Sequence, residues 1–376
     1  MAREAAHQPD NILIIALAIL ILLGLLMLFT ASIVISKEKT RSDKNPEGST
    51  TYYFFHQILF ALLPGIFLAF LISKMPISFF KSIALFALFA SIFCLLLIFI
   101  PKLAFEAGGA TRWVRIAGYT FQPSELAKLA LILYFGALFE KKFHNNQIKD
   151  FKSGFLPFLL IFGAFAVLLV LQPDMGTLIV MALISLFMFF MAQGKFRHIL
   201  LFMLIGIIAL LLYMNIFPHS AQRFTTFLNP EKDIKGAGYQ INQSLIAIGS
   251  GGLTGVGIGN GIQKYNYLPE TLSDTIFAVW AEETGLLGSL ALIIIYLIIG
   301  WRGLIISKRA PDKFSQLVAV GITTWIVFQA FLNIMANSGL VPFTGLPLPL
   351  VSYGGTAIIT TLMAMGILIN ISKKTI

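Results

Sequence analysis

The chain is 376 residues long, 57% hydrophobic and only 12% charged, with a mean hydropathy of +0.86. Soluble domains carry about 25% charged residues, so this composition excludes an ordinary soluble globular protein and indicates a membrane protein. The formal charge of +10 does not point to a nucleic-acid partner, because the basic residues follow a membrane topology. Cys94, the only cysteine, lies in an apolar run and cannot form a disulfide within the chain.

Apolar runs long enough to cross a bilayer recur along the chain, since a spanning helix needs roughly 20 residues. The first run is longer than a signal-peptide core, so we interpret it as a retained span. Charged residues enter the fourth and eighth runs, which makes their boundaries the weakest. The pattern predicts an all-α polytopic membrane protein with about ten transmembrane helices, at residues 11–35, 54–73, 77–100, 123–140, 154–171, 175–193, 197–217, 273–299, 315–338 and 354–371.

Ten spans would put both ends of the chain on one side of the membrane. With the ends inside, the inner segments hold an excess of Lys and Arg over Asp and Glu that equals the whole formal charge of +10. Cytoplasmic segments of membrane proteins are enriched in Lys and Arg in this way. We therefore predict a multi-pass protein of the bacterial cytoplasmic membrane with both termini in the cytoplasm.

Three outer segments interrupt the predicted spans. Residues 36–53 are polar with mixed charge and predict a solvated loop. Residues 101–122 are too polar to span and predict a short interfacial or re-entrant piece. Residues 218–272 form a large outer loop, in which 238–249 is expected to form a short amphipathic helix near the membrane surface. No linker or repeat is evident, so a single membrane domain over 1–376 is expected.

The motifs of soluble enzymes are missing from the sequence. The glycines at 249–261 give no GxxxxGK and have no strand–turn–helix context, which rejects a nucleotide-binding loop. The five histidines have no metal-ligand spacing. No cofactor is predicted; a bound divalent cation stays open, but the sequence shows no set of metal ligands.

The run QPSELAKLA at 122–130 gathers charged residues at the start of the fourth span. Pro123 suits the first turn of a helix, where its missing N–H costs least. Glu125 then lies near the positive end of the helix dipole. Lys128, three residues further on the same face, predicts an ion pair with Glu125. The sequence leaves open whether this pair has a functional role or only helps to pack the bundle.

The run LPETLSDTIFAVWAEETG at 268–285 leads into the eighth span. We expect Ser273 to cap the helix and Asp274 to lie in its first turn, where the carboxylate could also simply complement the helix dipole. Glu282 and Glu283 lie about 12 to 14 Å deeper, at roughly 1.5 Å per residue. Acids at such a depth are expensive, and they indicate a buried network or an ion path.

Several basic residues fall on the predicted outer side, against the insertion bias, which favours a specific anionic partner. A lipid phosphate or pyrophosphate held by guanidinium groups would fit. Ordinary pairing with Glu231, Asp233 and Glu270 is the alternative. The basic residues of this set are Arg112, Arg115, Arg223, Lys232, Lys235 and Lys264.

Five runs, in this order, resemble the SEDS family, the bacterial shape, elongation, division and sporulation proteins that include FtsW and RodA. The resemblance covers almost the whole chain beyond residue 100, and the runs around GAGYQ and PFTGLPLPLVSYGG are more similar to the FtsW division branch than to RodA. The runs are TRWVRIAGYTFQPSELAKLAL (111–131), LQPDMGT (171–177), GAGYQINQSLIAIGSGGLTGVGIG (236–259), YLPETLSDTIFAVWAEETGLLG (267–288) and GLPLPLVSYGG (345–355).

The resemblance implies a peptidoglycan glycosyltransferase for septal synthesis in cell division. Such an enzyme polymerises lipid II, a disaccharide-pentapeptide on undecaprenyl pyrophosphate, at the outer face of the cytoplasmic membrane. Asp274 matches the family's essential aspartate, and Glu125 and Lys128 match its conserved ion pair. The implied partners are a class B penicillin-binding transpeptidase and other divisome membrane proteins.

On this hypothesis Asp274 is the general base that takes the proton from an acceptor hydroxyl. Glu125 and Lys128 complete the predicted catalytic set by orienting or tuning Asp274. The leaving pyrophosphate needs positive charge nearby. The predicted substrate-binding residues, basic side chains first, are Arg112, Arg115, Arg223, Lys264, Glu270, Gln243 and Ser352.

Two alternatives stay open. Leu272 and Ser273 stand where the family pattern LPExHTDFIFAV has His-Thr, and this departure favours a non-catalytic division scaffold. Glu282, Glu283 and the interrupted outer segments would suit a transporter or a flippase of a lipid-linked precursor. The polar residues gather at the outer mouth of the spans and not at the membrane midplane, which argues against transport.

Overall fold

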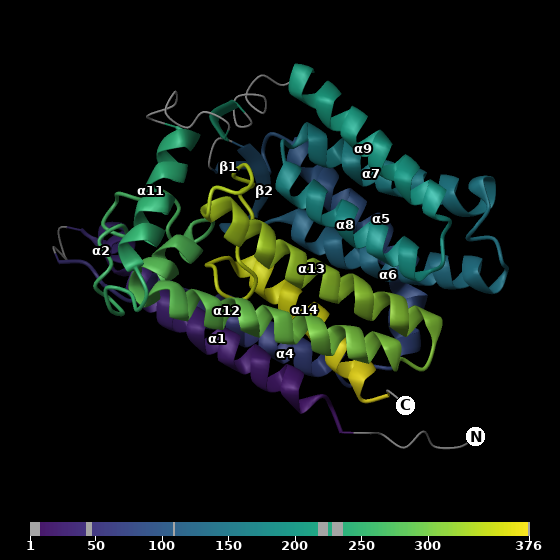
Figure 1. The fold of residues 1–376 in the computed structure, drawn as a ribbon, viewed down its shortest axis with the longest axis horizontal. Helices are drawn as coiled ribbons and strands as arrows, with labels where there is room; N and C mark the ends of the chain where they lie inside the picture. Colours follow the sequence, from purple (N-terminus) through teal and green to yellow (C-terminus); the bar gives the residue numbers. More distant parts are fainter. Residues whose placement is uncertain (1–7, 43–46, 108–109, 217–224, 228–235, 375–376) are drawn as a thin grey trace.

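The computed structural model describes residues 8–42, 47–107, 110–216, 225–227 and 236–374. Long helices lie side by side in a bundle, and a small sheet and the helix Ala237–Gly251 lie at one end of it (Figure 1). We call this end, where the helices Ile276–Lys308 and Gly355–Ser372 begin, the site end. At the opposite end the backbone N–H of Asp10 donates to Ser372 Oγ at 3.2 Å. The two described ends of the chain therefore lie together, as an even number of spans requires.

The first part of the chain supplies the helices from α1 to α6. Irregular helical turns adjoin two of them. A π-helical turn at Ile58–Leu62 joins α3 to α4, and a 3-10 turn at Leu97–Phe99 follows α5. Their bounds are α1 Asn11–Ala31, α2 Ile33–Thr40, α3 Tyr52–Gln57, α4 Leu63–Ile72, α5 Ile77–Leu96 and α6 Pro123–His144.

The second part of the chain supplies the remaining long helices. A π-helical turn at Phe151–Phe155 leads into α7. The bounds are α7 Leu156–Leu171, α8 Met175–Met191, α9 Phe196–Ile216, α11 Ala237–Gly251, α12 Ile276–Lys308, α13 Lys313–Asn337 and α14 Gly355–Ser372.

A helix lies in each of the ten predicted ranges, so the helical membrane fold is confirmed. Within the described residues, eight helical segments are long and apolar enough to cross a membrane, and α8 is a shorter apolar helix. α6 carries charged side chains near both of its ends and is not among these eight. The number of ten transmembrane helices therefore stays a prediction. The helix expected at 238–249 is present as α11, whereas 36–53 is not loop throughout, because α2 continues to Thr40.

The segment 101–122 contains a three-stranded antiparallel sheet. That it forms a short interfacial or re-entrant piece stays a prediction. The strands β1 (Ala104–Ala107), β2 (Ala110–Ile116) and β3 (Tyr119–Phe121) pair in the order β1-β2-β3. Ala117 and Gly118, both at positive φ, form the two-residue turn between β2 and β3. Such a turn matches the twist of a hairpin, and the aromatic and β-branched residues of these strands favour extended backbone.

α13 occupies the centre of the bundle, and 83% of its most apolar window is buried. In Figure 1 it lies between α12 on one side and α8 on the other, with α14 behind it. α13 packs against α6, α8, α11, α12 and α14. Its polar residues are therefore placed to bond with several segments at once.

α12 is broken at Gly285, whose backbone has φ 66° and ψ −163°. The loop after α11 fills the break: Val256 N–H donates to Glu282 O at 3.0 Å, and Leu286 N–H donates to Gly252 O at 2.9 Å. A Cβ on Gly285 would lie only 2.4 Å from the backbone nitrogen of Gly255. Glycine at both positions allows the two backbones to approach and to satisfy the hydrogen bonds that the break would otherwise leave open.

Candidate active site

The Glu125–Lys128 pair lies in the first turns of α6, which begins at Pro123 as the sequence predicts. Lys128 Nζ lies 2.7 Å from Glu125 Oε1, and both side chains are buried. Two charges out of water are costly unless each finds further partners. Lys128 Nζ also donates to Gln329 Oε1 at 2.7 Å and lies 4.6 Å from the centre of the Trp325 ring. Lys128 is therefore held by α13 through the Gln329 amide and the Trp325 ring.

Asp174, which sequence analysis left without a role, adds a second buried carboxylate to this region. It caps α8 by accepting from Thr177 N–H at 3.3 Å, and it accepts from Ser124 Oγ at 3.1 Å. Ser124 is the neighbour of Glu125 on α6. The Gln-Pro-Asp run before α8 was the available sequence signal, because Asp is a preferred N-cap residue.

Asp274 lies in a turn just before α12 and is half-buried. The expectation that Ser273 caps this helix was wrong. α12 begins at Ile276 after Thr275, and Ser273 Oγ instead donates to Glu270 Oε2 at 2.8 Å. Ser273 N–H and Thr275 N–H both donate to Glu270 O, so a tight turn forms where the first helical turn was expected.

The guanidinium of Arg112 and the carboxylate of Asp274 lie beside the same point of the backbone, at Gly345. A Cβ on Gly345 would be 3.4 Å from Arg112 Nη1 and 3.4 Å from Asp274 Oδ2. Arg112 is half-buried and donates through Nη2 to Pro173 O, next to Asp174. The structure thus brings a cation and the candidate base to one place, between β2, the start of α12 and the loop before α14.

Ser352 supports the turn that carries Asp274. Its hydroxyl donates to Ser273 O at 2.5 Å and accepts from Leu348 N–H at 2.7 Å, and the side chain is buried. Tyr353 N–H donates to Leu272 O at 2.7 Å. The structure therefore places Ser352 under the Asp274 turn, where it touches the protein backbone.

Two amides of α13 hold the backbone of Asp274. Asn333 Nδ2 and Asn337 Nδ2 each donate to Asp274 O at 2.9 Å. Sequence analysis missed both residues, because an Asn in an apolar span shows nothing of a partner about 60 positions away in the chain. A polar residue inside a predicted span was the only signal available.

Lys264 lies away from this site. Its Nζ is 2.7 Å from Glu283 Oε1 and donates to Gly259 O at 2.6 Å, and the side chain is fully buried. Glu283 Oε2 also accepts from Gly259 N–H at 2.9 Å and from Thr30 Oγ1 at 3.1 Å. A pyrophosphate would have to break this pair to reach the Lys264 ammonium, so the proposed site does not include it.

Glu282 has a similar structural setting. Its Oε1 accepts from Ile262 N–H at 2.8 Å and from Gln263 N–H at 3.3 Å. The two deep acids therefore form the buried network that sequence analysis considered, and their bonds hold the loop 255–264 against α12. Within the described residues these bonds occupy the carboxylates that an ion path would need.

The other predicted substrate-binding residues are spread over the site end. Arg115 is exposed on β2, with its guanidinium 3.7 Å from the centre of the Phe105 ring. Glu270 is exposed in the turn before Asp274. Arg223 lies outside the described residues.

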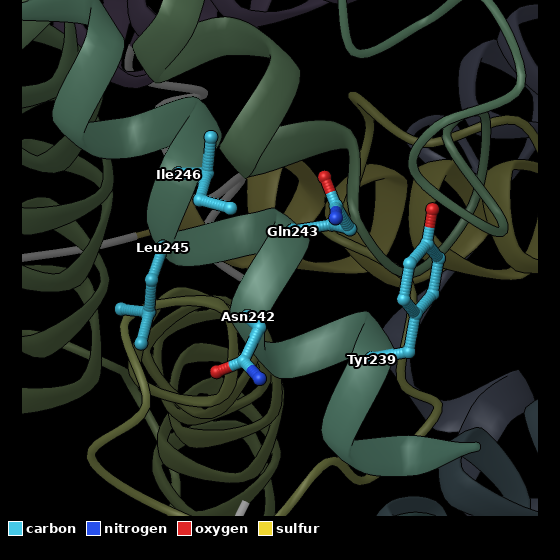
Figure 2. A pocket seen from close by; sticks show the side chains of 5 residues that line it. All are labelled: Tyr239, Asn242, Gln243, Leu245 and Ile246. Carbon is cyan, nitrogen blue, oxygen red and sulfur yellow. The ribbon is translucent and has the colours of Figure 1, made fainter. Parts of the chain in front are cut away.

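Gln243 lies on α11, beside a hollow of about 610 Å³. Figure 2 shows Gln243 and Tyr239 projecting from the same side of that helix. The described residues that line the hollow are Tyr239, Asn242, Gln243, Leu245 and Ile246, all from α11. The hollow therefore does not include Asp274 or the Glu125–Lys128 pair.

No group of three or more His, Cys, Asp and Glu side chains in the described part of the chain is arranged to hold a metal ion. The divalent cation left open by the sequence stays untested. Together, the fold and the site define a polytopic helical membrane protein with an Asp, an Arg and a buried Glu–Lys pair gathered at one end of its bundle.

Comparison with known proteins places the chain more narrowly. Residues 10–376 match the family model of the FtsW, RodA and SpoVE proteins, described as cell cycle proteins. The chain is 35% identical over 367 residues to stage V sporulation protein E of Bacillus subtilis (strain 168). This alignment covers 97% of both chains. It is 35% identical over 365 residues to a probable peptidoglycan glycosyltransferase FtsW of Geobacter sp. (strain M18), again over 97% of both.

Solved structures agree with these sequence relatives. A chain of a peptidoglycan synthase complex, described as coordinating polymerization and crosslinking, superimposes with a TM-score of 0.77 at 26% identity over 97% of both chains. A mutant of the rod shape determining protein RodA of Thermus thermophilus gives a TM-score of 0.70 at 25% identity over 98% of both. The chain belongs to the FtsW/RodA/SpoVE family, as the resemblance of its sequence runs implied.

Proposed function

We propose that this protein is a peptidoglycan glycosyltransferase that polymerises lipid II for septal synthesis at the outer face of the bacterial cytoplasmic membrane. The observation that carries the proposal is the meeting of the Asp274 carboxylate and the Arg112 guanidinium at Gly345. A carboxylate base and a cation for a departing phosphate are the two groups that this transfer needs. The relatives named as probable peptidoglycan glycosyltransferases support the reaction class.

In the proposed reaction the Asp274 carboxylate accepts the proton of a sugar hydroxyl on the acceptor. The hydroxyl oxygen forms a bond to the anomeric carbon of the donor, and the bond from that carbon to the pyrophosphate breaks. Undecaprenyl pyrophosphate leaves with the electron pair, and the proton on Asp274 passes to water. Arg112 stabilises the charge that develops on the leaving group, and Arg115 and Arg223 are the further basic candidates from the sequence.

Partner and orientation form part of the same proposal. The site end faces outward, and the end that holds Asp10 and Ser372 faces the cytoplasm. A class B penicillin-binding transpeptidase works beside the protein, and other divisome membrane proteins assemble with both. The support for such a partner is the structural neighbour described as a synthase complex that couples polymerization to crosslinking.

The flippase alternative keeps little support. It relied on Glu282 and Glu283, and both carboxylates bond to Lys264 or to backbone N–H groups of the loop 255–264. A transporter built on these acids would need them to face a wet path. Loss of the Glu283–Lys264 pair should therefore act through the loop and not through transport.

The test uses the purified protein in vesicles that contain lipid II, alone and with its class B transpeptidase, with glycan chains resolved by gel electrophoresis. The wild type should form chains, and Asp274→Asn should form none while keeping its melting temperature. The substitution keeps the shape of the side chain and removes the base. Chains from Asp274→Asn at the wild-type rate would overturn the mechanism.

A further inference from the structure

The central helix α13 carries three amide side chains at intervals of four residues, Gln329, Asn333 and Asn337. Residues four apart lie on one face of a helix, so the three amides form a column that runs toward the site end. All three are buried, at 1% exposure or less. Buried amides in an apolar bundle are costly unless they form hydrogen bonds, and the amide nitrogens of all three donate to backbone carbonyls.

The first amide joins the ion pair to the loop before α14. Gln329 Oε1 accepts from Lys128 Nζ at 2.7 Å and from Trp325 Nε1 at 2.8 Å. Its Nε2 donates to Pro347 O at 2.9 Å. One side chain thus connects Lys128 with the backbone of the loop before α14.

The second amide joins that loop to the Asp274 turn. Asn333 Nδ2 donates to Leu346 O at 2.7 Å and to Asp274 O at 2.9 Å. Leu346 is the neighbour of Gly345, where Arg112 and Asp274 meet. The two hydrogens of a single NH₂ group therefore hold both backbones that frame the site.

The third amide completes the column. Asn337 Nδ2 donates to Asp274 O at 2.9 Å and also lies within bonding distance of Asn333, at 2.9 Å from its backbone oxygen and 3.3 Å from its Oδ1. The first backbone bonds of α12 go to Thr275 O, from Ala278 N–H at 3.0 Å and Val279 N–H at 3.4 Å. The carbonyl of Asp274, one residue before, is held instead by the two amides of α13.

We infer that Asn333 and Asn337 are positioning residues for Asp274, and that through Gln329 the same column ties Asp274 to the Glu125–Lys128 pair. This inference rests on the proposed function and gives the ion pair a physical route to the base, through the peptide that carries Asp274. A misplacement of about 1 Å in a reacting group can cost on the order of 100-fold in rate. Loss of these donors should therefore lower kcat and leave KM nearly unchanged.

The decisive variant is Asn333→Asp, which keeps the side-chain shape and replaces the two donors by an acceptor. Asn370→Asp is the matched control. Asn370 Nδ2 also bridges two backbone carbonyls, Ile72 O at 2.9 Å and Met75 O at 2.6 Å, and is buried near the opposite end of the bundle. The two variants lose the same kind of bond, so both should lower the melting temperature by similar amounts.

Lipid II polymerisation is measured for both variants with the partner transpeptidase present. We expect Asn333→Asp to lower kcat by about 10- to 100-fold with KM within about 3-fold, and Asn370→Asp to keep the wild-type kcat of the folded protein. If Asn333→Asp does not fold, Asn337→Leu decides, because it removes only one donor to Asp274 O and leaves the Leu346 bridge intact.

The outcomes separate the two claims. Wild-type kcat in the decisive variant, or an equal loss in Asn370→Asp, would overturn the inference and leave the glycosyltransferase standing. No glycan from the wild type under any condition would remove the proposed function, and the positioning role with it.

Discussion

Glu125 and Lys128 form the most deeply buried charged pair near the site, and their burial defines what substitution should do. Lys128→Met would leave the Glu125 carboxylate without its cation inside the bundle. Breaking a buried pair in this way costs about 3–5 kcal/mol. We expect a clearly lower melting temperature in detergent. Adding Glu125→Gln to the same chain should recover a large part of the loss, and no recovery would contradict the account of the pair.

Gly345 is the second residue whose role can be tested alone. Its φ of +66° suits glycine, and a methyl group there would touch both Arg112 and Asp274. Gly345→Ala should lower the polymerisation rate about tenfold or more, because the methyl fills space between the base and the cation. Gly118→Ala is the control: its φ is +86° with no atom within 4 Å of the added Cβ. It shares the backbone cost of about 1–2 kcal/mol and should keep the rate.

Local spacing explains which site residues could be predicted from the sequence. Glu125 and Lys128 are three residues apart on one helix, and their ion pair was confirmed. Lys264 was expected at a pyrophosphate and pairs with Glu283, which lies 19 positions away. The bonds of Asn333 to Asp274 and of Ser124 to Asp174 join distant parts of the chain. No spacing rule reaches that far, so these contacts needed the fold.

Among the elements, α12 carries the feature with the sharpest prediction. Gly285→Ala would place a Cβ 2.4 Å from the backbone of Gly255, at a φ and ψ that only glycine adopts easily. The strain and overpacking together should cost about 2–5 kcal/mol. Gly206→Ala, on α9 with no neighbour within 4 Å of the added Cβ, should be neutral or slightly stabilising. Thermal unfolding of both variants compares them, and equal melting temperatures would contradict the account of the break.

Periodicity and length located the helices well and the irregular segments poorly. The ends of α6 and α13 fall near the predicted ones, because Pro123 and the apolar runs mark them. The sheet at 104–121 was missed, since a short polar segment between spans gives no sign of which strands pair. The break in α12 was also missed. Its cause is a loop that enters from elsewhere in the chain.

Orientation in the membrane is the prediction that belongs to the whole molecule. Cys94 is the only cysteine, so Cys94→Ser gives a background for single-cysteine labelling. Asn260→Cys, exposed at the site end, should react with a membrane-impermeant maleimide in intact cells. Lys308→Cys, exposed at the opposite end, should react only after the membrane is opened. The reverse pattern would place the site in the cytoplasm and contradict the proposed reaction at the outer face.

The composition and the positive charge of the inner segments predict a membrane protein with both ends inside, but not what it does. The functional proposal needed the resemblance of five runs to a known family and then the geometry at Gly345. Arg112 and Asp274 lie 162 positions apart and meet only because β2, the start of α12 and the loop before α14 converge. The site therefore forms only when these three distant segments of the chain are folded together.

Release of undecaprenyl pyrophosphate from lipid II tests the central claim most directly, because a transferase breaks that bond, whereas a flippase or a scaffold leaves it intact. The measurement compares the wild-type protein with Asp274→Asn, each with the partner transpeptidase in vesicles. We predict one undecaprenyl pyrophosphate for each glycosidic bond formed by the wild type and none above background for the variant. Equal release by the two proteins, or translocation of lipid II without any release, would contradict the account.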